Sequence, residues 1–289
     1  MKPLHGILFK IAGVALLVVA LGLIKVLGDR YPVFQLMFIR ASFGLLVAFA
    51  LAQRHDAGLR TLLPRRPLGH LTRAMFGLVG TFCMVTAIRY LPLADIWALG
   101  ASAPLLVTAL SVPLLGEQVG WRRWTAVLVG LVGVLIILRP GAGVFQTAAL
   151  LPLADALCYA LSMITIRKLT ATDSTLSIMC SFSLIVVLAT GLAMPFQWVA
   201  PSAADWLILL AIGVLGAFGQ LLIIRAFALA PANLVAPFDY TGMLWMILVG
   251  AVFFGEFPDA MVLLGSALVV ASGLYVLWRE AVKARGGGA

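Results

Sequence analysis

The sequence predicts an all-α integral membrane protein, with ten transmembrane helices arranged as two inverted five-helix repeats. Hydrophobic residues make up 63% of the 289 residues and charged residues 11%, and the mean hydropathy is +1.12. Soluble domains are about 45–50% apolar and about 25% charged. A soluble fold of this length needs a polar surface that the chain cannot supply. We therefore expect the polypeptide to lie in a lipid bilayer, and the two halves of the chain resemble each other.

The apolar residues form ten runs, each close to the roughly 20 residues that a helix needs to cross a membrane. The first run is too long for a signal-peptide core, so we expect it to remain as a helix. Pro231 marks the boundary between the eighth and ninth runs. Pro104, Pro113 and Pro237 are expected to break the fourth and ninth spans and to free backbone groups there. The expected spans are residues 7–27, 33–52, 68–90, 93–115, 121–139, 147–168, 174–194, 205–229, 231–254 and 258–279.

An internal repeat relates the two halves. Residues 77–89 and 213–225 have equal length and share five identical positions, and the second copy follows the first by close to half the chain. A second repeated motif has nearly the same spacing: Leu-Gly-Glu at 115–117 corresponds to Phe-Gly-Glu at 254–256. Each half holds five spans, an odd number, so the second half must insert upside down. We expect one repeat at 1–143 and an inverted copy at 144–289.

The basic residues predict the orientation. With the N-terminus in the cytoplasm, cytoplasmic segments hold fourteen of the twenty Lys and Arg residues, including Lys10 and Arg73, and the other side holds three. Basic loops favour the cytoplasm, so both termini are expected there. The net charge of +9 is explained by this topology, and no nucleic-acid partner is expected.

Three charged residues lie deep within the predicted spans. Arg40, Asp155 and Asp239 each fall about seven or eight residues into a span, roughly 10–12 Å into the hydrocarbon core. None recurs in the other half: Arg40 aligns with Ser183, and Asp155 with Ala12. Scaffold residues should recur, whereas residues that bind an asymmetric solute need not, so these three are candidate solute contacts. The alternative is a buried ion pair, such as Arg40 with one aspartate, that fixes helix register.

Aromatic and polar side chains at similar depths complete the candidate site. Tyr159 lies one helical turn from Asp155, on the same helix face. An aromatic face beside a carboxylate suits a cationic or zwitterionic organic solute. The remaining candidate cavity residues are Trp97, Gln220, Tyr240 and Trp245. The recurring glycines at 77 and 80, and at 213, 216 and 219, favour close helix packing, with easier rocking of the two halves as the alternative.

These features resemble the drug/metabolite transporter superfamily and its ten-span EamA-type branch. The resemblance covers nearly the whole chain and rests on the two halves, the Gly-rich spans three and eight, the Leu-Pro-Leu-Ala and Ala-Pro-Ala-Asn turns and the Gly-Glu closures. The sequence is also similar to the YddG-type exporters of aromatic and other amino acids. The resemblance implies a proton-coupled or facilitative exporter in the bacterial inner membrane, with a cavity lined by spans one, three, four, six, eight and nine.

The expected function is therefore a secondary transporter that exports small amino-acid-like metabolites by alternating access. Its expected partners are a small-molecule substrate, protons where transport is coupled, and the lipid bilayer. An aspartate in the cavity could bind the substrate amine or carry a proton, and Asp239 is favoured because Pro237 and Gly242 flank it.

No cofactor and no metal site are expected, because the three cysteines and three histidines form no ligand cluster in the sequence. The rival hypothesis is a membrane-embedded enzyme acting on a lipid-like substrate. Such an enzyme would need a catalytic acid, His or Ser cluster that the sequence does not contain.

Overall fold

The computed structural model describes residues 2–54, 58–115, 120–138, 147–169, 172–229 and 236–286. Within these ranges the chain is helical and contains no strand. The helices are α1 (Lys2–Leu27), α2 (Val33–Gln53), α3 (Pro67–Ala87), α4 (Leu93–Gly100), α5 (Ala103–Leu115), α6 (Trp121–Leu138), α7 (Leu150–Leu169), α8 (Thr175–Gly191), α9 (Met194–Gln197), α10 (Ala203–Leu229), α12 (Thr241–Phe254) and α13 (Ala260–Gly286). Short 3-10 turns are η1 (Gly28–Arg30), η2 (Gly58–Leu62), η3 (Thr147–Ala149) and η4 (Ala236–Tyr240).

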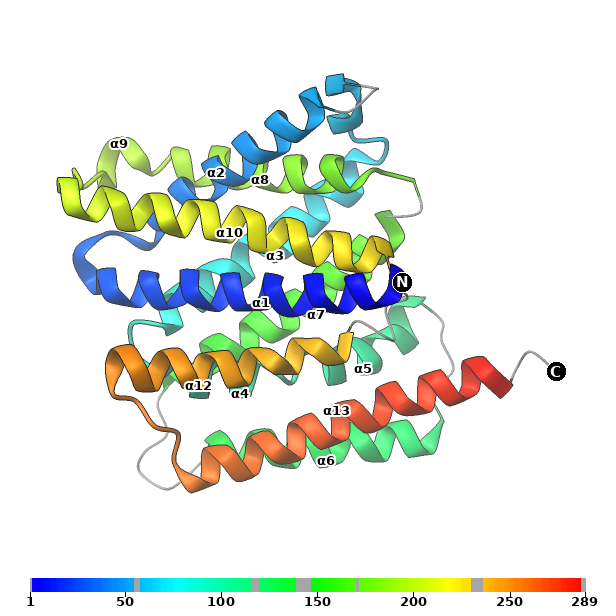
Figure 1. Cartoon of the computed structure of the whole chain (residues 1–289). Helices are drawn as coiled ribbons and strands as arrows, with labels where there is room; N and C mark the ends of the chain where they lie inside the picture. Colours follow the sequence, from blue (N-terminus) through cyan, green and yellow to red (C-terminus); the bar gives the residue numbers. More distant parts are fainter. Residues whose placement is uncertain are drawn as a thin grey trace.

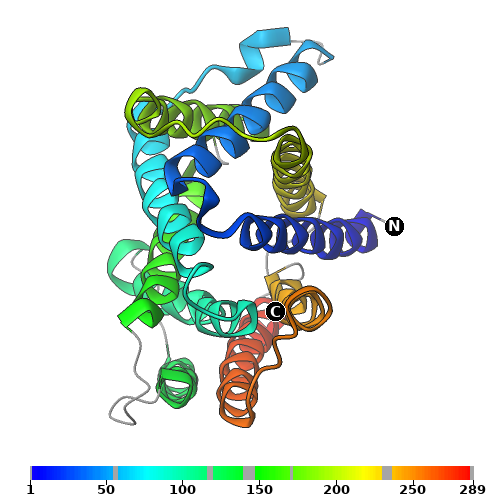
Figure 2. The same ribbon diagram turned by 90° about the vertical axis from the view of Figure 1, so that its left-hand side faces the viewer.

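The helices lie at the positions predicted for the ten spans. Five are long and apolar enough to cross a membrane by length and composition, and the other five positions hold shorter apolar helices. The fold class is thus an all-α membrane bundle, as predicted. Figure 1 shows that α1 begins and α13 ends on the same side of the bundle. We call that side the terminal face. The other side, where α1 ends and α2 begins, is the opposite face, and Figure 2 looks onto it.

Two of the spans are interrupted. The fourth span divides into α4 and α5 at Ala101 and Ser102, just before Pro104, which has no N–H with which to continue the helical hydrogen bonds. The ninth span begins as the 3-10 turn η4 and becomes α-helical at Thr241. Thr241 aligns with Ser102 at the spacing of the repeated Gly-Glu motif. The two interruptions therefore fall at matching positions of the two halves of the sequence.

One predicted helix break is not found, and some other predicted boundaries cannot be compared with the structure. The expected break at Pro113 is absent, because α5 continues through this residue to Leu115. Pro231, Glu117 and the boundary between the repeats at residues 143 and 144 lie outside the described residues.

Close helix contacts hold the bundle together where glycines face each other. The helix α1 packs mainly against α10, and α3 against α7. A Cβ atom added at Gly13 would lie 2.9 Å from the carbonyl oxygen of Gly219. At one edge of the bundle α6 packs against α13, where a Cβ at Gly133 would lie 2.7 Å from the carbonyl oxygen of Gly265 (Figures 1 and 2). In lipid such approaches stabilise helix pairs by van der Waals contact.

Ion pairs tie the helices together at the opposite face. Lys25 of α1 pairs with Glu256, which follows α12 and also accepts a hydrogen bond from the N–H of Leu93 at 3.1 Å. Arg30 pairs with Asp205 of α10 at 2.8 Å. These contacts join α1 to α4, α10 and α12 on this side of the bundle.

A hydrogen-bonded carboxylate organises the loop between α7 and α8 at the terminal face. Asp173 accepts hydrogen bonds from the hydroxyl of Thr172 at 2.6 Å and from the backbone N–H of Arg65 at 2.6 Å. Its Oδ1 lies 3.1 Å from Nε2 of His70. Burial raises the pKa of Asp173, but these hydrogen bonds outweigh it and hold the pKa at about 2. The start of α3 is thereby attached to this loop.

Candidate functional site

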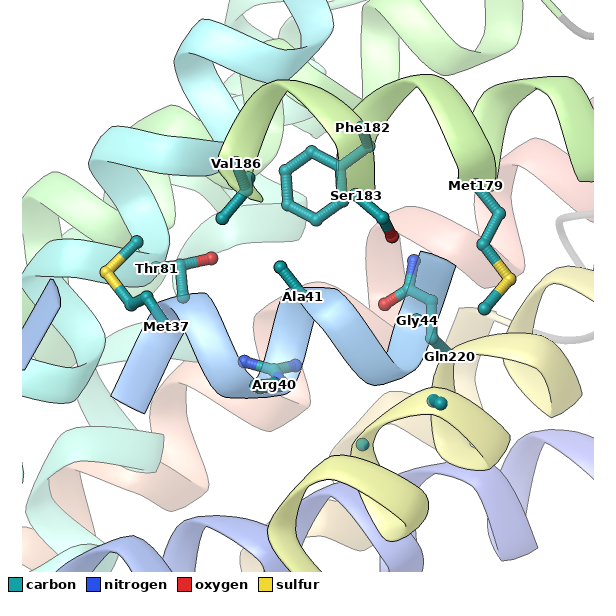
Figure 3. A pocket seen from close by; sticks show the side chains of 12 residues that line it. Met37, Arg40, Ala41, Gly44, Thr81, Met179, Phe182, Ser183, Val186 and Gln220 are labelled. Carbon is teal, nitrogen blue, oxygen red and sulfur yellow. The ribbon is translucent and has the colours of Figure 1, made fainter. Parts of the chain in front are cut away.

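A cavity of about 50 Å³ lies between α2, α3, α8 and α10 (Figure 3). A water needs about 10–15 Å³, so the cavity of about 50 Å³ has room for a few waters and is too small for an organic solute. The lining residues are Met37, Arg40, Ala41, Gly44, Thr81, Met179, Phe182, Ser183, Val186, Gly216, Ala217 and Gln220. A solute could enter only after these helices move apart.

Arg40 is the charged residue of this lining. Its side chain lies against Gly216 of α10, where an added Cβ would be 3.0 Å from its Nε atom. Within the described ranges Arg40 makes no ion pair or hydrogen bond. Gln220, also predicted as a cavity residue, lines the same cavity from α10 (Figure 3). Arg40 and Gln220 are thus the two candidate site residues that line this cavity.

Asp155 lies on α7 beside Gly80 of α3, where an added Cβ would be 2.7 Å from its Oδ1. It interacts electrostatically with Arg40, yet the two side chains form no ion pair. Asp155 also makes no hydrogen bond through its side chain to any residue that the structure describes. The register-fixing ion pair between Arg40 and this aspartate is therefore not formed in this conformation.

Asp239 has a different partner, which the sequence did not predict. Its Oδ1 lies 2.6 Å from Nζ of Lys10, whose side chain is fully buried, while the side chain of Asp239 is 30% exposed. The assignment of Lys10 to a cytoplasmic segment is wrong, because α1 begins before it and η4 packs against it. Its alignment with Leu153 in the second half would have marked it as an unmatched charge.

Arg73 is a second buried basic residue whose interior position the sequence did not predict. The distribution of basic residues predicts a cytoplasmic position for it, but it lies on α3 and is only 5% exposed. Its guanidinium carbon lies 3.7 Å from the ring centroid of Phe182, and its Nε and Nη1 atoms have no hydrogen-bond partner among the described residues. Its position aligns with Leu209 in the other half, so it too is an unmatched charge.

Tyr159 connects these charged groups. It interacts electrostatically with Asp239, with Asp155 of its own helix and with Arg73 of α3, and it is 41% exposed. Because these neighbours are interior residues, we interpret the exposure as access to the inside of the bundle. The predicted pairing of Tyr159 with Asp155 on one helix face agrees with this arrangement.

The other three predicted aromatic residues lie in helix contacts. A Cβ at Gly242 of α12 would be 2.0 Å from Cζ2 of Trp97, so this ring fills the crossing of α4 and α12. The hydroxyl of Tyr240 lies against Gly273 of α13 and has no hydrogen-bond partner in the part of the chain that the structure describes. Trp245 packs against a buried apolar cluster that includes Leu21, Ile96 and Met246. The lining of the cavity in Figure 3 includes none of the three.

The described residues contain no group of three or more His, Cys, Asp or Glu side chains that could hold a metal ion. What the interior offers is a set of guanidinium, ammonium and carboxylate groups with hydrogen-bonding side chains around them. Such groups can bind and orient a polar solute.

Three bacterial proteins named as transporters are similar to this chain over most of its length. The chain is 33% identical over 248 residues to a riboflavin transporter of Vibrio cholerae, covering 84% of this chain and 83% of that protein. It is 30% identical over 254 residues to the pseudopaline exporter CntI of Pseudomonas aeruginosa, covering 86% and 87%. It is 26% identical over 257 residues to an S-adenosylmethionine uptake transporter of Rickettsia prowazekii, covering 89% and 86%.

A solved crystal structure shares the fold, with a TM-score of 0.68 at 22% identity over 98% of this chain and 99% of the other. The model of the EamA-like transporter family matches residues 4–139 and again residues 146–278. Because these two matches cover most of the chain, the protein belongs to the EamA-like transporter family.

Proposed function

We propose that this small-molecule transporter exports an amino-acid-like metabolite by alternating access. The observation that carries the proposal is the pair Arg40 and Asp155: two opposite charges inside the bundle, near each other but not paired. Charge within a membrane span is costly unless it has a role or a partner. A zwitterion could place its carboxylate at Arg40 and its amine at Asp155.

Three observations support two inverted repeats at 1–143 and 144–289. The family model matches each half separately. The contact of α1 with α10 has its counterpart in that of α7 with α3, as an inverted repeat requires. The interruptions of the fourth and ninth spans fall at aligned positions. Transporters with inverted repeats bind their solutes between the repeats, near the middle of the membrane.

The cavity lies where aligned residues of the two halves meet. Arg40 aligns with Ser183, and Thr81 aligns with Ala217 at the spacing of the repeat formed by residues 77–89 and 213–225. All four residues line the cavity. This supports a solute site on the axis that relates the halves.

The ion pairs at the opposite face support a conformation that is closed on that side. Lys25 with Glu256, and Arg30 with Asp205, must separate for the solute to leave there. In our proposal the terminal face is cytoplasmic, in a bacterial inner membrane. Moving Lys10 and Arg73 from the loops to the interior leaves twelve basic residues on that side against three, which keeps the predicted orientation.

Asp155 is a better candidate than Asp239 for binding an amine or a coupling proton. The flanking Pro237 and Gly242 favour Asp239 on sequence grounds. The ion pair with Lys10 satisfies Asp239, whereas Asp155 has no such partner among the described residues. The relatives are named for different solutes and for both uptake and export, so their names support a small organic solute but do not select one.

The test is transport by the purified protein in liposomes, with a panel of labelled amino acids and with or without a pH gradient. We expect uptake of at least one amino acid above that of empty liposomes, and an at least tenfold loss in Asp155→Asn. Asp29→Asn is the matched control, because Asp29 is 79% exposed and its surface ion pair contributes little. If no amino acid moves, or if Asp155→Asn transports at the wild-type rate, the proposal is wrong. A lower rate with unchanged pH dependence would assign Asp155 to solute binding alone.

A further inference from the structure

The middle of the bundle carries more positive than negative charge. The charged side chains described in the interior are Lys10, Arg40, Arg73, Asp155 and Asp239, three cations and two carboxylates. The pair of Lys10 and Asp239 is neutral. Two guanidinium groups and one carboxylate remain, so positive charge is in excess.

Arg73 is the least satisfied of these groups. It is buried, and its Nε and Nη1 atoms donate no hydrogen bond to any described residue. Its electrostatic neighbour is the phenol of Tyr159 and not a carboxylate. A guanidinium does not lose its proton in proteins, so the charge remains. Leaving such donors unsatisfied is costly, and a bound anion would remove that cost.

The opposite face shows that this chain pairs other cations with carboxylates. Lys25 has Glu256 and Arg30 has Asp205, and these pairs join helices far apart in the sequence. Arg40 and Arg73 form no such pair with a described residue. Arg40 lines the cavity where we place the solute, and Arg73 contacts Phe182 of the same lining.

One aromatic residue, Phe182, links Arg73 to the cavity that Arg40 lines. Arg73 stacks on Phe182, and Phe182 lines the cavity together with Arg40 (Figure 3). A planar guanidinium binds carboxylate or phosphate oxygens with two parallel hydrogen bonds. An anion that enters when the cavity widens would meet both groups.

We propose that the transported solute carries a net negative charge and that its oxyanion groups, carboxylate or phosphate, bind Arg73 and Arg40. The amine of the solute faces Asp155. A monoanionic solute then neutralises the excess charge of the interior. This inference rests on the proposed transport function and specifies its substrate class.

The first test measures oxyanion binding by thermal unfolding of the full-length protein in detergent at constant ionic strength. Succinate and inorganic phosphate are the probes, and choline chloride is the reference salt. A ligand that binds the folded state raises its stability in proportion to the logarithm of its concentration over Kd. We expect at least one oxyanion to stabilise the wild type, and Arg73→Gln to weaken its binding at least tenfold. Arg122→Gln, an exposed control on α6, should leave binding unchanged.

Stabilisation by succinate alone identifies a carboxylate site, and stabilisation by phosphate alone a phosphate site. If neither stabilises the wild type, or if Arg73→Gln binds as the wild type does, the inference is overturned. Should Arg73→Gln fail to fold, Arg73→Lys and Arg40→Gln replace it. Both are expected to weaken binding, and unchanged binding in both overturns the inference.

The second test compares matched solutes in liposome counterflow: glutamate with glutamine, and phosphoserine with serine. We expect the anionic member of at least one pair to exchange at least tenfold faster. If the neutral members exchange as fast or faster, the inference fails while the transport function stands. If no amino acid exchanges, the proposed function fails, and oxyanion binding alone then decides the charge preference.

Discussion

Adding a methyl group at Gly80 or Gly216 should impair transport without removing a charge. These glycines are aligned in the sequence repeat, and each accommodates one candidate group. A Cβ at Gly80 would lie 2.7 Å from Oδ1 of Asp155, and one at Gly216 would lie 3.0 Å from Nε of Arg40. Non-bonded contacts to carbon are optimal at about 3.5–4.0 Å, so each side chain must move by several tenths of an ångström.

The stability cost of these substitutions should be modest. Overpacking destabilises the folded state by about 1–3 kcal/mol, whereas replacing a helical glycine by alanine stabilises the helix by about 1 kcal/mol. A net change of about 0–2 kcal/mol leaves most of the protein folded. Misplacing a binding group should have a larger effect on transport, because a loss of about 1.4 kcal/mol in binding is tenfold.

The assay is the initial rate of liposome uptake of the best solute, normalised to folded protein by size-exclusion chromatography. Gly191→Ala is the control, because its Cβ would lie 3.4 Å from the nearest atom, an ordinary contact at the opposite face. We expect at least a tenfold loss in Gly80→Ala and Gly216→Ala. Rates within twofold of the control for both variants would refute the proposed roles of Asp155 and Arg40.

Three further predictions concern stability and closure. Asp239→Asn removes the ion pair of the fully buried Lys10 and should destabilise the protein by about 3–5 kcal/mol in thermal unfolding; a loss under about 1 kcal/mol contradicts this. Lys25→Met should speed the labelling of the buried Cys83 by an impermeant maleimide added at the opposite face, and unchanged labelling argues against closure there. The pKa of Asp173, about 2, lies below the roughly 3.9 of an unfolded Asp, so its stabilising effect is complete above about pH 4 and is lost as the pH falls through 2. The cost of Asp173→Asn should therefore be smaller at pH 3 than at pH 8, and equal costs contradict the assignment.

The helices could be predicted because each span is a long apolar run whose ends carry charges or turn residues. The helix α6 illustrates this, with residues 121–139 predicted and Trp121–Leu138 observed. The interruption of the fourth span was also predicted, since Pro104 removes a helical hydrogen bond whatever surrounds it. These are local properties of the chain.

The charge partners could not be predicted because they depend on packing between distant segments. Lys10 and Asp239 lie in opposite halves of the chain, and only the meeting of α1 with η4 brings them together. The placement of Tyr240 depends on packing in the same way, because the neighbouring side chains of Asp239 and Tyr240 point about 120° apart in the 3-10 turn η4. Tyr240 therefore contacts α13 while its neighbour Asp239 faces α1.

The recurring residues and the unmatched charges have separate roles in the proposed mechanism. Gly80 and Gly216 recur, and so do the interruptions of the fourth and ninth spans, as expected of two halves that pack and move alike. At these two aligned glycines the chain places opposite charges, Asp155 at one and Arg40 at the other. A site on the axis between identical halves could not distinguish the two ends of a solute. The unmatched charges give the site a direction, so it can hold a solute whose own ends differ in charge.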